Sequence, residues 1–147
     1  MQLKPDIDQL YRTMMIIWLV LLFSQFALFG VAYSIGREAA EANLENGFLG
    51  PMPLIIIGAV VLALTNLAIS IVIRGRSIEQ AISDQNVKLV QTGLIIGCAL
   101  CESISLIGMV LLFAFLYPYF YFWFALGILG IFLHFPRRND LINASSK

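Results

Sequence analysis

A long apolar stretch with one acidic residue near its centre constrains this chain more than any other feature. Residues 89–115 read LVQTGLIIGCALCESISLIGMVLLFAF. A bilayer core about 30 Å thick is crossed by about 20 apolar residues in a helix, at roughly 1.5 Å per residue. The stretch is therefore long enough to span a membrane, and Glu102 falls near the midplane.

An acidic residue at that depth needs an explanation. An ionised carboxylate at the bilayer centre costs at least ~2.5 kcal/mol on insertion scales, so we expect Glu102 to be neutral unless a cation or a donor meets it. Intramembrane carboxyls often mark ion or proton pathways. The alternative is a structural role, in which a protonated Glu102 is hydrogen-bonded inside a helix bundle.

The composition agrees with a membrane protein. Hydrophobic residues make up 60% of the chain and charged residues 12%. This hydrophobic share is larger than a soluble domain of this size needs to fill its core. The net charge is zero, so no attraction to nucleic acid is indicated. We predict an all-α membrane domain with four transmembrane helices in the lipid bilayer. Their expected ranges are about 13–35, 53–73, 89–115 and 119–135.

The basic residues predict the orientation. Four spans place both termini and a polar loop at 74–88 on one side, and a longer connection at 36–52 on the other. The first side holds eight of the nine basic residues, namely Lys4, Arg12, Arg74, Arg76, Lys88, Arg137, Arg138 and Lys147. Positive charge favours the cytoplasmic side. We therefore expect a multi-pass protein of the cell (inner) membrane with cytoplasmic termini.

Residues 73–115 carry a resemblance to a known family. They begin IRGRSIEQAISDQN and contain ALCESISLIG around Glu102. This segment resembles the polar loop and second helix of the proteolipid subunit c of rotary ATP synthases and ATPases. The resemblance implies a helical hairpin made by the second and third spans, with Glu102 at the place of the carboxylate that binds the transported ion. It also implies a homo-oligomer or a subunit of a larger membrane complex.

Two further polar residues join Glu102 in the candidate ion-binding site. Ser103 follows it directly, and Gln25 lies about 13 residues into the first span, at the same depth as Glu102. Ser24 and Asn66 are possible supporting residues, although Asn66 would need a tilt or a water to reach the carboxyl. Because no Gln stands near 69–71, where sodium-binding members of the family carry one, a proton is the expected ligand.

No pattern for soluble chemistry is present, and we assign no catalytic residue, cofactor or metal. Cys98 and Cys101 imitate a redox pair, but within an apolar helix they are expected to be small buried residues. The only histidine, His134, is expected at the membrane interface.

Two functions remain open from the sequence. The first is proton binding and translocation through Glu102 within a larger complex. The second is a non-transporting accessory or scaffold subunit that keeps the hairpin for helix packing. The second is favoured by the absence of the family's glycine ladder between residues 53 and 73, and by the extra spans.

Overall fold

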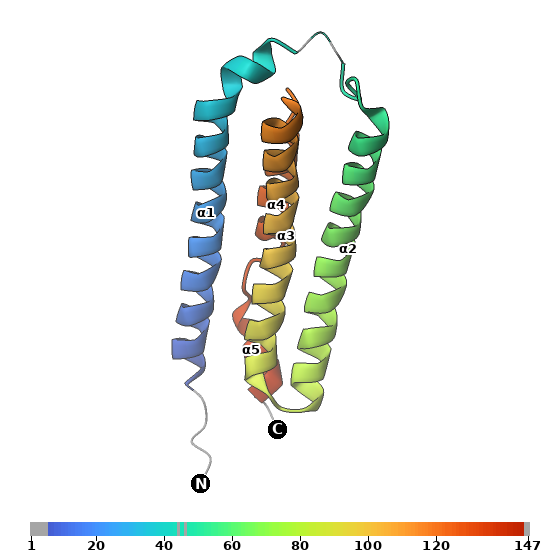
Figure 1. The fold of residues 1–147 in the computed structure, drawn as a ribbon. Helices are drawn as coiled ribbons and strands as arrows, with labels where there is room; N and C mark the ends of the chain where they lie inside the picture. The colour runs from blue at the N-terminus through green and yellow to red at the C-terminus, as the bar shows by residue number, and fades with distance from the viewer. Residues whose placement is uncertain (1–5, 44, 46, 146–147) are drawn as a thin grey trace.

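Three long helices stand side by side in the computed structural model, which describes residues 6–145 except 44 and 46 (Figure 1). They are α1 (Ile7–Glu41), α2 (Pro53–Ser83) and α3 (Val87–Phe115). Two shorter helices follow, α4 (Tyr121–Leu133) and α5 (Arg138–Ser145). The three long helices are each long and apolar enough to cross a membrane.

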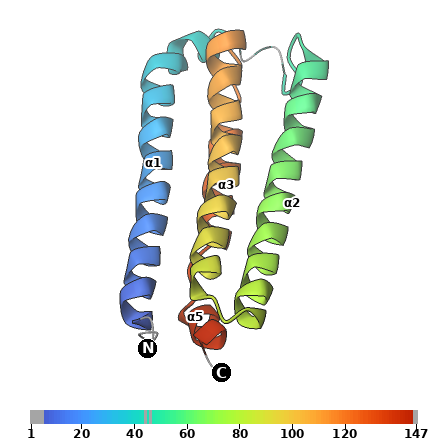
Figure 2. The same cartoon turned by 60° about the horizontal axis from the view of Figure 1, so that its bottom comes forward.

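The order of the helices brings α3 to the centre. In Figure 1, α1 and α2 flank α3, and α4 runs behind it. The beginning of α1, the turn between α2 and α3, and α5 all lie at one end of the bundle (Figure 2). The all-α fold is as predicted, and three of the four predicted spans fall in helices that are long and apolar enough to cross a membrane. α2 and α3 run in opposite directions. Two of the basic residues used for the orientation, Lys4 and Lys147, lie outside the described residues.

The helix ends follow local chemistry. Asp6 begins α1, because its Oδ1 accepts from the backbone N–H groups of Asp8 at 3.1 Å and Gln9 at 3.3 Å. Pro53 opens α2, where its missing N–H costs nothing. Asn86 caps α3, accepting from the N–H of Lys88 at 3.2 Å. Each long helix thus starts at a residue whose chemistry favours a helix start.

The segment 74–83 differs from its prediction. It was expected to be part of a polar loop, but it continues α2, and residues 84–86 alone form the turn. Ala81 is fully buried and Ile78 is half-buried, while most of the remaining side chains are exposed. The segment is therefore an amphipathic helix end, and its polarity alone was a poor guide to its structure.

The fourth apolar segment is also shorter than expected. The prediction was 119–135, whereas α4 has 13 residues, from Tyr121 to Leu133. Residues 118–120 form a turn, and Pro136 separates α4 from α5. The first helix is longer than its predicted span, since α1 extends to Glu41, inside the segment 36–52 that was expected to be a connection.

Small residues of α3 let its neighbours approach closely. A Cβ added at Gly108 would collide with the Trp123 side chain, and one added at Gly97 would collide with the His134 ring. Towards α2, a Cβ at Gly93 would lie 2.5 Å from Ser77 Cβ. Trp123 belongs to α4 and His134 directly follows it, so α4 and its C-terminal end cover part of the small-residue face of α3 within the same chain.

Candidate functional site

Glu102 forms a hydrogen bond across the interface between α1 and α3. Its Oε1 lies 2.5 Å from Ser24 Oγ. The Glu102 side chain is half-buried, and its neighbours one turn away on either side, Ala99 and Leu106, are exposed. The carboxyl therefore lies at the edge of the contact between α1 and α3 and is partly exposed at the side of the bundle.

The Ser24 hydroxyl has two oxygen neighbours. Besides Glu102 Oε1, the carbonyl oxygen of Leu21 lies 2.7 Å away. A hydroxyl has one proton to donate, and an ionised carboxylate and a carbonyl are both acceptors. If Glu102 carries a proton, it donates to Ser24 Oγ and Ser24 donates to Leu21. The neutral carboxyl thus satisfies both contacts. With an ionised carboxylate, the single Ser24 proton can be donated to only one of the two oxygens, Glu102 Oε1 or the Leu21 carbonyl oxygen.

Gln25 has a different partner from the one expected. Its side chain is fully buried, and its Oε1 accepts a hydrogen bond from Ser105 of α3. Successive helix residues point about 100° apart, so Ser24 faces Glu102 while Gln25 turns to the bundle interior. The prediction placed Gln25 at the right depth. Of the two adjacent residues that were predicted for the site, it is Ser24, predicted as a supporting residue, that contacts Glu102.

The packing around Gln25 is tight. A Cβ on Gly127 of α4 would collide with Ser105 Oγ and would lie 2.9 Å from the Cys101 carbonyl oxygen. Gly127 is therefore required for α4 to approach this polar pair. Among the described residues, Gln25 Nε2 has no hydrogen-bond partner, although it is buried.

Ser103 faces α2. Asn66 Nδ2 donates to Ser103 Oγ at 2.8 Å, and Ser103 donates to the carbonyl of Leu100 at 2.6 Å. Asn66 thus meets Ser103 rather than the carboxyl. The predicted residues Glu102, Ser103, Gln25, Asn66 and Ser24 lie at one level, but they make three separate contacts. Two of these lie between α1 and α3, Glu102 with Ser24 and Gln25 with Ser105, and the third lies between α2 and α3, Ser103 with Asn66.

The donor set suits a proton better than a metal ion. Within the described residues, no group of three or more His, Cys, Asp or Glu side chains gathers to hold a metal. One carboxyl and one hydroxyl are far fewer than the six or more oxygens that a cation such as Ca²⁺ takes. What the pair can do is hold one proton in a short hydrogen bond.

His134 is 1% exposed, so it is buried inside the bundle just after the end of α4. Its Nδ1 lies 2.7 Å from the Gly130 carbonyl oxygen and its Nε2 lies 3.3 Å from that of Ser70. Gly97 makes the room for the ring. The glycine could have signalled this from the sequence, but only with the pairing of α3 and α4 already known.

The two cysteines are buried and free, as predicted. Cys101 Sγ lies 3.6 Å from Ser70 Oγ and 3.9 Å from His134 Nδ1. A Cβ on Gly130 would lie 2.6 Å from the same sulfur. Cys101 therefore fills the contact between α2, α3 and α4 as a small apolar residue.

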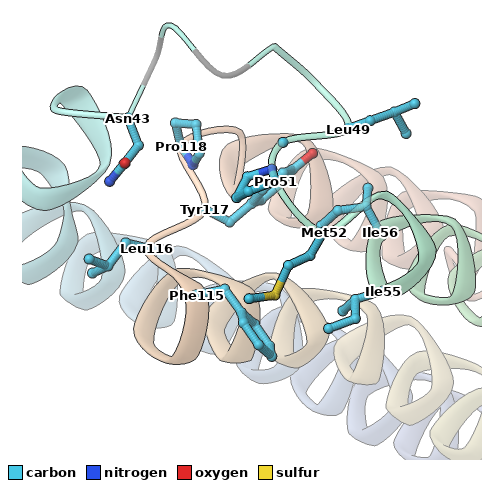
Figure 3. A pocket seen from close by; sticks show the side chains of 11 residues that line it. Asn43, Leu49, Pro51, Met52, Ile55, Ile56, Phe115, Leu116, Tyr117 and Pro118 are labelled. Atoms are coloured by element: carbon cyan, nitrogen blue, oxygen red, sulfur yellow. The ribbon is translucent and has the colours of Figure 1, made fainter.

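A small pocket lies at the other end of the bundle, beside the turns at 49–52 and 115–118 (Figure 3). Its volume is about 50 Å³, room for little more than a water or two at ~30 Å³ each. Tyr117 donates to the carbonyl of Phe48 at 2.9 Å. Burial, with Tyr119 and Tyr121 nearby, raises the pKa of Tyr117 to about 12, so this hydroxyl stays neutral. The pocket is too small for a substrate.

No family model, curated protein or solved structure matches this chain.

Proposed function

We propose that this protein is a membrane subunit in which Glu102 binds and releases a proton, as the carboxyl of the subunit c family does. The observation that carries the proposal is the pair of Glu102 and Ser24. A neutral carboxyl completes its hydrogen bonds, and the half-buried position leaves it accessible from the side of the bundle. Proton movement needs both properties, since a proton carrier must be stable when neutral and reachable when it exchanges.

A partner subunit has to supply the opposing charge. In the described helices, basic residues stand only towards the ends, at Arg12, Arg37, Arg74, Arg76, Lys88 and Arg138. None is at the level of Glu102, so the cation that drives release of the proton comes from another chain. That chain would approach the side of the bundle where Glu102 is partly exposed. We therefore infer a larger complex, and the distribution of the basic residues favours cytoplasmic termini.

Carbodiimide labelling tests the proposal. A hydrophobic carbodiimide reacts with protonated carboxyls in the membrane, so it should label Glu102 and label it less as the pH rises. Glu102→Gln should abolish the labelling and any proton movement of the complex, and keep the fold, because the amide has nearly the same shape. Glu79→Gln is the matched control, because Glu79 is exposed near the end of α2. Unchanged labelling in Glu102→Gln, or unchanged proton movement, would refute the proposal.

A second candidate function has an observation of its own. The small-residue face of α3 is covered by α4, with Trp123 against Gly108 and His134 against Gly97. That face is therefore not available to a neighbouring protomer. This favours the accessory or scaffold subunit, which packs in a complex and moves no proton. Native mass measurement separates the two functions. A closed homo-oligomeric ring supports the c-like role. A single copy in a hetero-complex, together with unchanged activity of that complex in Glu102→Gln, supports the accessory role.

A further inference from the structure

A second polar site lies at the end of the bundle that holds the α2–α3 turn, far along α3 from Glu102. A cavity of about 220 Å³ opens there between α2 and the segment from the end of α4 to α5. Figure 2 brings this end of the bundle forward. At ~30 Å³ per water, the cavity has room for about seven waters. It is lined by Ile71, Arg74, Gly75, Ile78, Leu133, His134, Arg137 and Asp140.

The charges lining the cavity do not balance. Arg74 and Arg137 are close enough for their like charges to repel, and Asp140 is the acidic residue that lines the cavity with them. Asp140 Oδ2 is 3.9 Å from Arg74, a long ion pair. One acid against two guanidinium groups leaves the cavity positive. An anion there would offset the excess charge.

One of the two arginines is held in place by the protein. Arg74 donates to the carbonyl of Leu133 at 3.1 Å and to that of Phe135 at 2.7 Å. Its side chain is 15% exposed. These bonds use two of its five N–H groups, so donors remain for a ligand. Arg137, in contrast, has an exposed side chain that is available to close over a bound group.

The walls of the cavity change character along the bundle axis. Towards the middle of the helices stand Ile71 and Leu133, which are 51% and 63% exposed. Towards the end stand the two arginines and Asp140, together with the side chain of Ile78. Gly75 leaves the wall between them open, since a Cβ there would meet nothing within 4 Å. An occupant with a charged head and an apolar tail matches both parts.

We propose that this cavity binds the phosphate headgroup of an anionic phospholipid from the surrounding bilayer, with Arg74 and Arg137 holding the phosphate and Ile71 and Leu133 contacting the acyl chains. Basic pockets between helices at the membrane surface bind such headgroups. The site is independent of proton binding at Glu102.

The test is native mass spectrometry of the whole protein in detergent, titrated with phosphatidylglycerol or with phosphatidylcholine. Phosphatidylglycerol should bind more tightly, because phosphatidylcholine has no net charge. Arg137→Gln should weaken phosphatidylglycerol binding about fivefold, the size expected for one basic residue near an anionic surface. Asp140→Asn should strengthen it. Arg76→Gln is the matched control, because Arg76 is an exposed basic residue of α2 that does not line the cavity.

A second variant fills the site without removing charge. Gly75→Leu should abolish phosphatidylglycerol binding and keep the fold, because Leu favours a helix and the position is open. Gly58→Leu adds the same side chain to another open position of α2. Three results would overturn the proposal: equal binding of the two lipids, equal loss in Arg76→Gln and Arg137→Gln, or displacement of the lipid by millimolar inorganic phosphate, which would indicate a soluble ligand.

Discussion

The hydroxyl of Ser24 is the hydrogen-bond partner of the Glu102 carboxyl. It links the carboxyl to the backbone of α1 through two short contacts, of 2.5 Å to Glu102 and 2.7 Å to Leu21. A neutral Glu102 should therefore show the infrared band of a protonated carboxyl in the folded protein at neutral pH. That band should vanish in Glu102→Gln. Its persistence in this variant would mean that another carboxyl is the protonated one.

The strength of this pair is measurable by a double-mutant cycle. Interhelical hydrogen bonds in membranes contribute about 0.6 kcal/mol on average and at most about 1.7 kcal/mol. We expect a coupling energy in that range between Ser24→Ala and Glu102→Ala, from unfolding free energies, because each substitution removes one partner of the hydrogen bond. Ser34→Ala is the control, because Ser34 bonds only to the carbonyl of Gly30, on the same helix. Coupling of Glu102 to Ser34 as large as to Ser24 would contradict the pairing.

The glycine at 127 gives a prediction about packing. Gly127→Ala places a methyl group against Ser105 and the carbonyl of Cys101, which is backbone and has no freedom to move aside. The variant should lose about 1–3 kcal/mol of stability through overpacking. Gly58→Ala, at an open position of α2, should instead gain up to about 1 kcal/mol through helix propensity. Equal effects of the two substitutions would show that α4 does not pack as described.

At the scale of the helices, the turn between α2 and α3 is the sharpest feature. Gln85 has a φ of 52°, in the left-handed region that costs residues with a Cβ about 1 kcal/mol or more. Gln85→Gly should therefore stabilise the protein by about 0.5–1 kcal/mol in chemical unfolding. Asp84 has a φ of −89°, so Asp84→Gly should destabilise it. Stabilisation by both would point to a longer, looser loop.

The sequence predicted helix existence well and helix ends poorly. Apolar length alone identified α1, α2 and α3, because the bilayer requires about 20 residues. It failed at 74–83, where a helix outside the apolar run is held by contacts of Ala81 and Ser77 that depend on the pairing with α3. The sequence likewise predicted how deep Gln25 lies in the bundle, but not which neighbouring helix residue its side chain contacts. Depth follows from counting residues, whereas direction depends on which helices are neighbours.

For the whole molecule, the prediction concerns which end of the helix bundle faces the cytoplasm. Both the α2–α3 turn and α5 lie at the end where α1 begins. A cysteine at Asp84 should react with an impermeant thiol reagent only from the cytoplasmic side, and one at Glu45 only from outside. Cys98 and Cys101 are buried, so they add little background. Labelling with the sides exchanged would reverse the orientation.

The brevity of α4 has a consequence for the membrane around the protein. Its 13 residues cover about 20 Å, about 10 Å less than a typical hydrocarbon core. Such a hydrophobic mismatch is relieved when the adjacent bilayer thins, at a cost of fractions of a kcal/mol for each ångström. Lipids beside Phe122 and Leu129, which are exposed on α4, would then be compressed while those beside α1 are not. The protein should therefore partition into thinner membranes, and a protein neighbour that covers α4 would release the deformation.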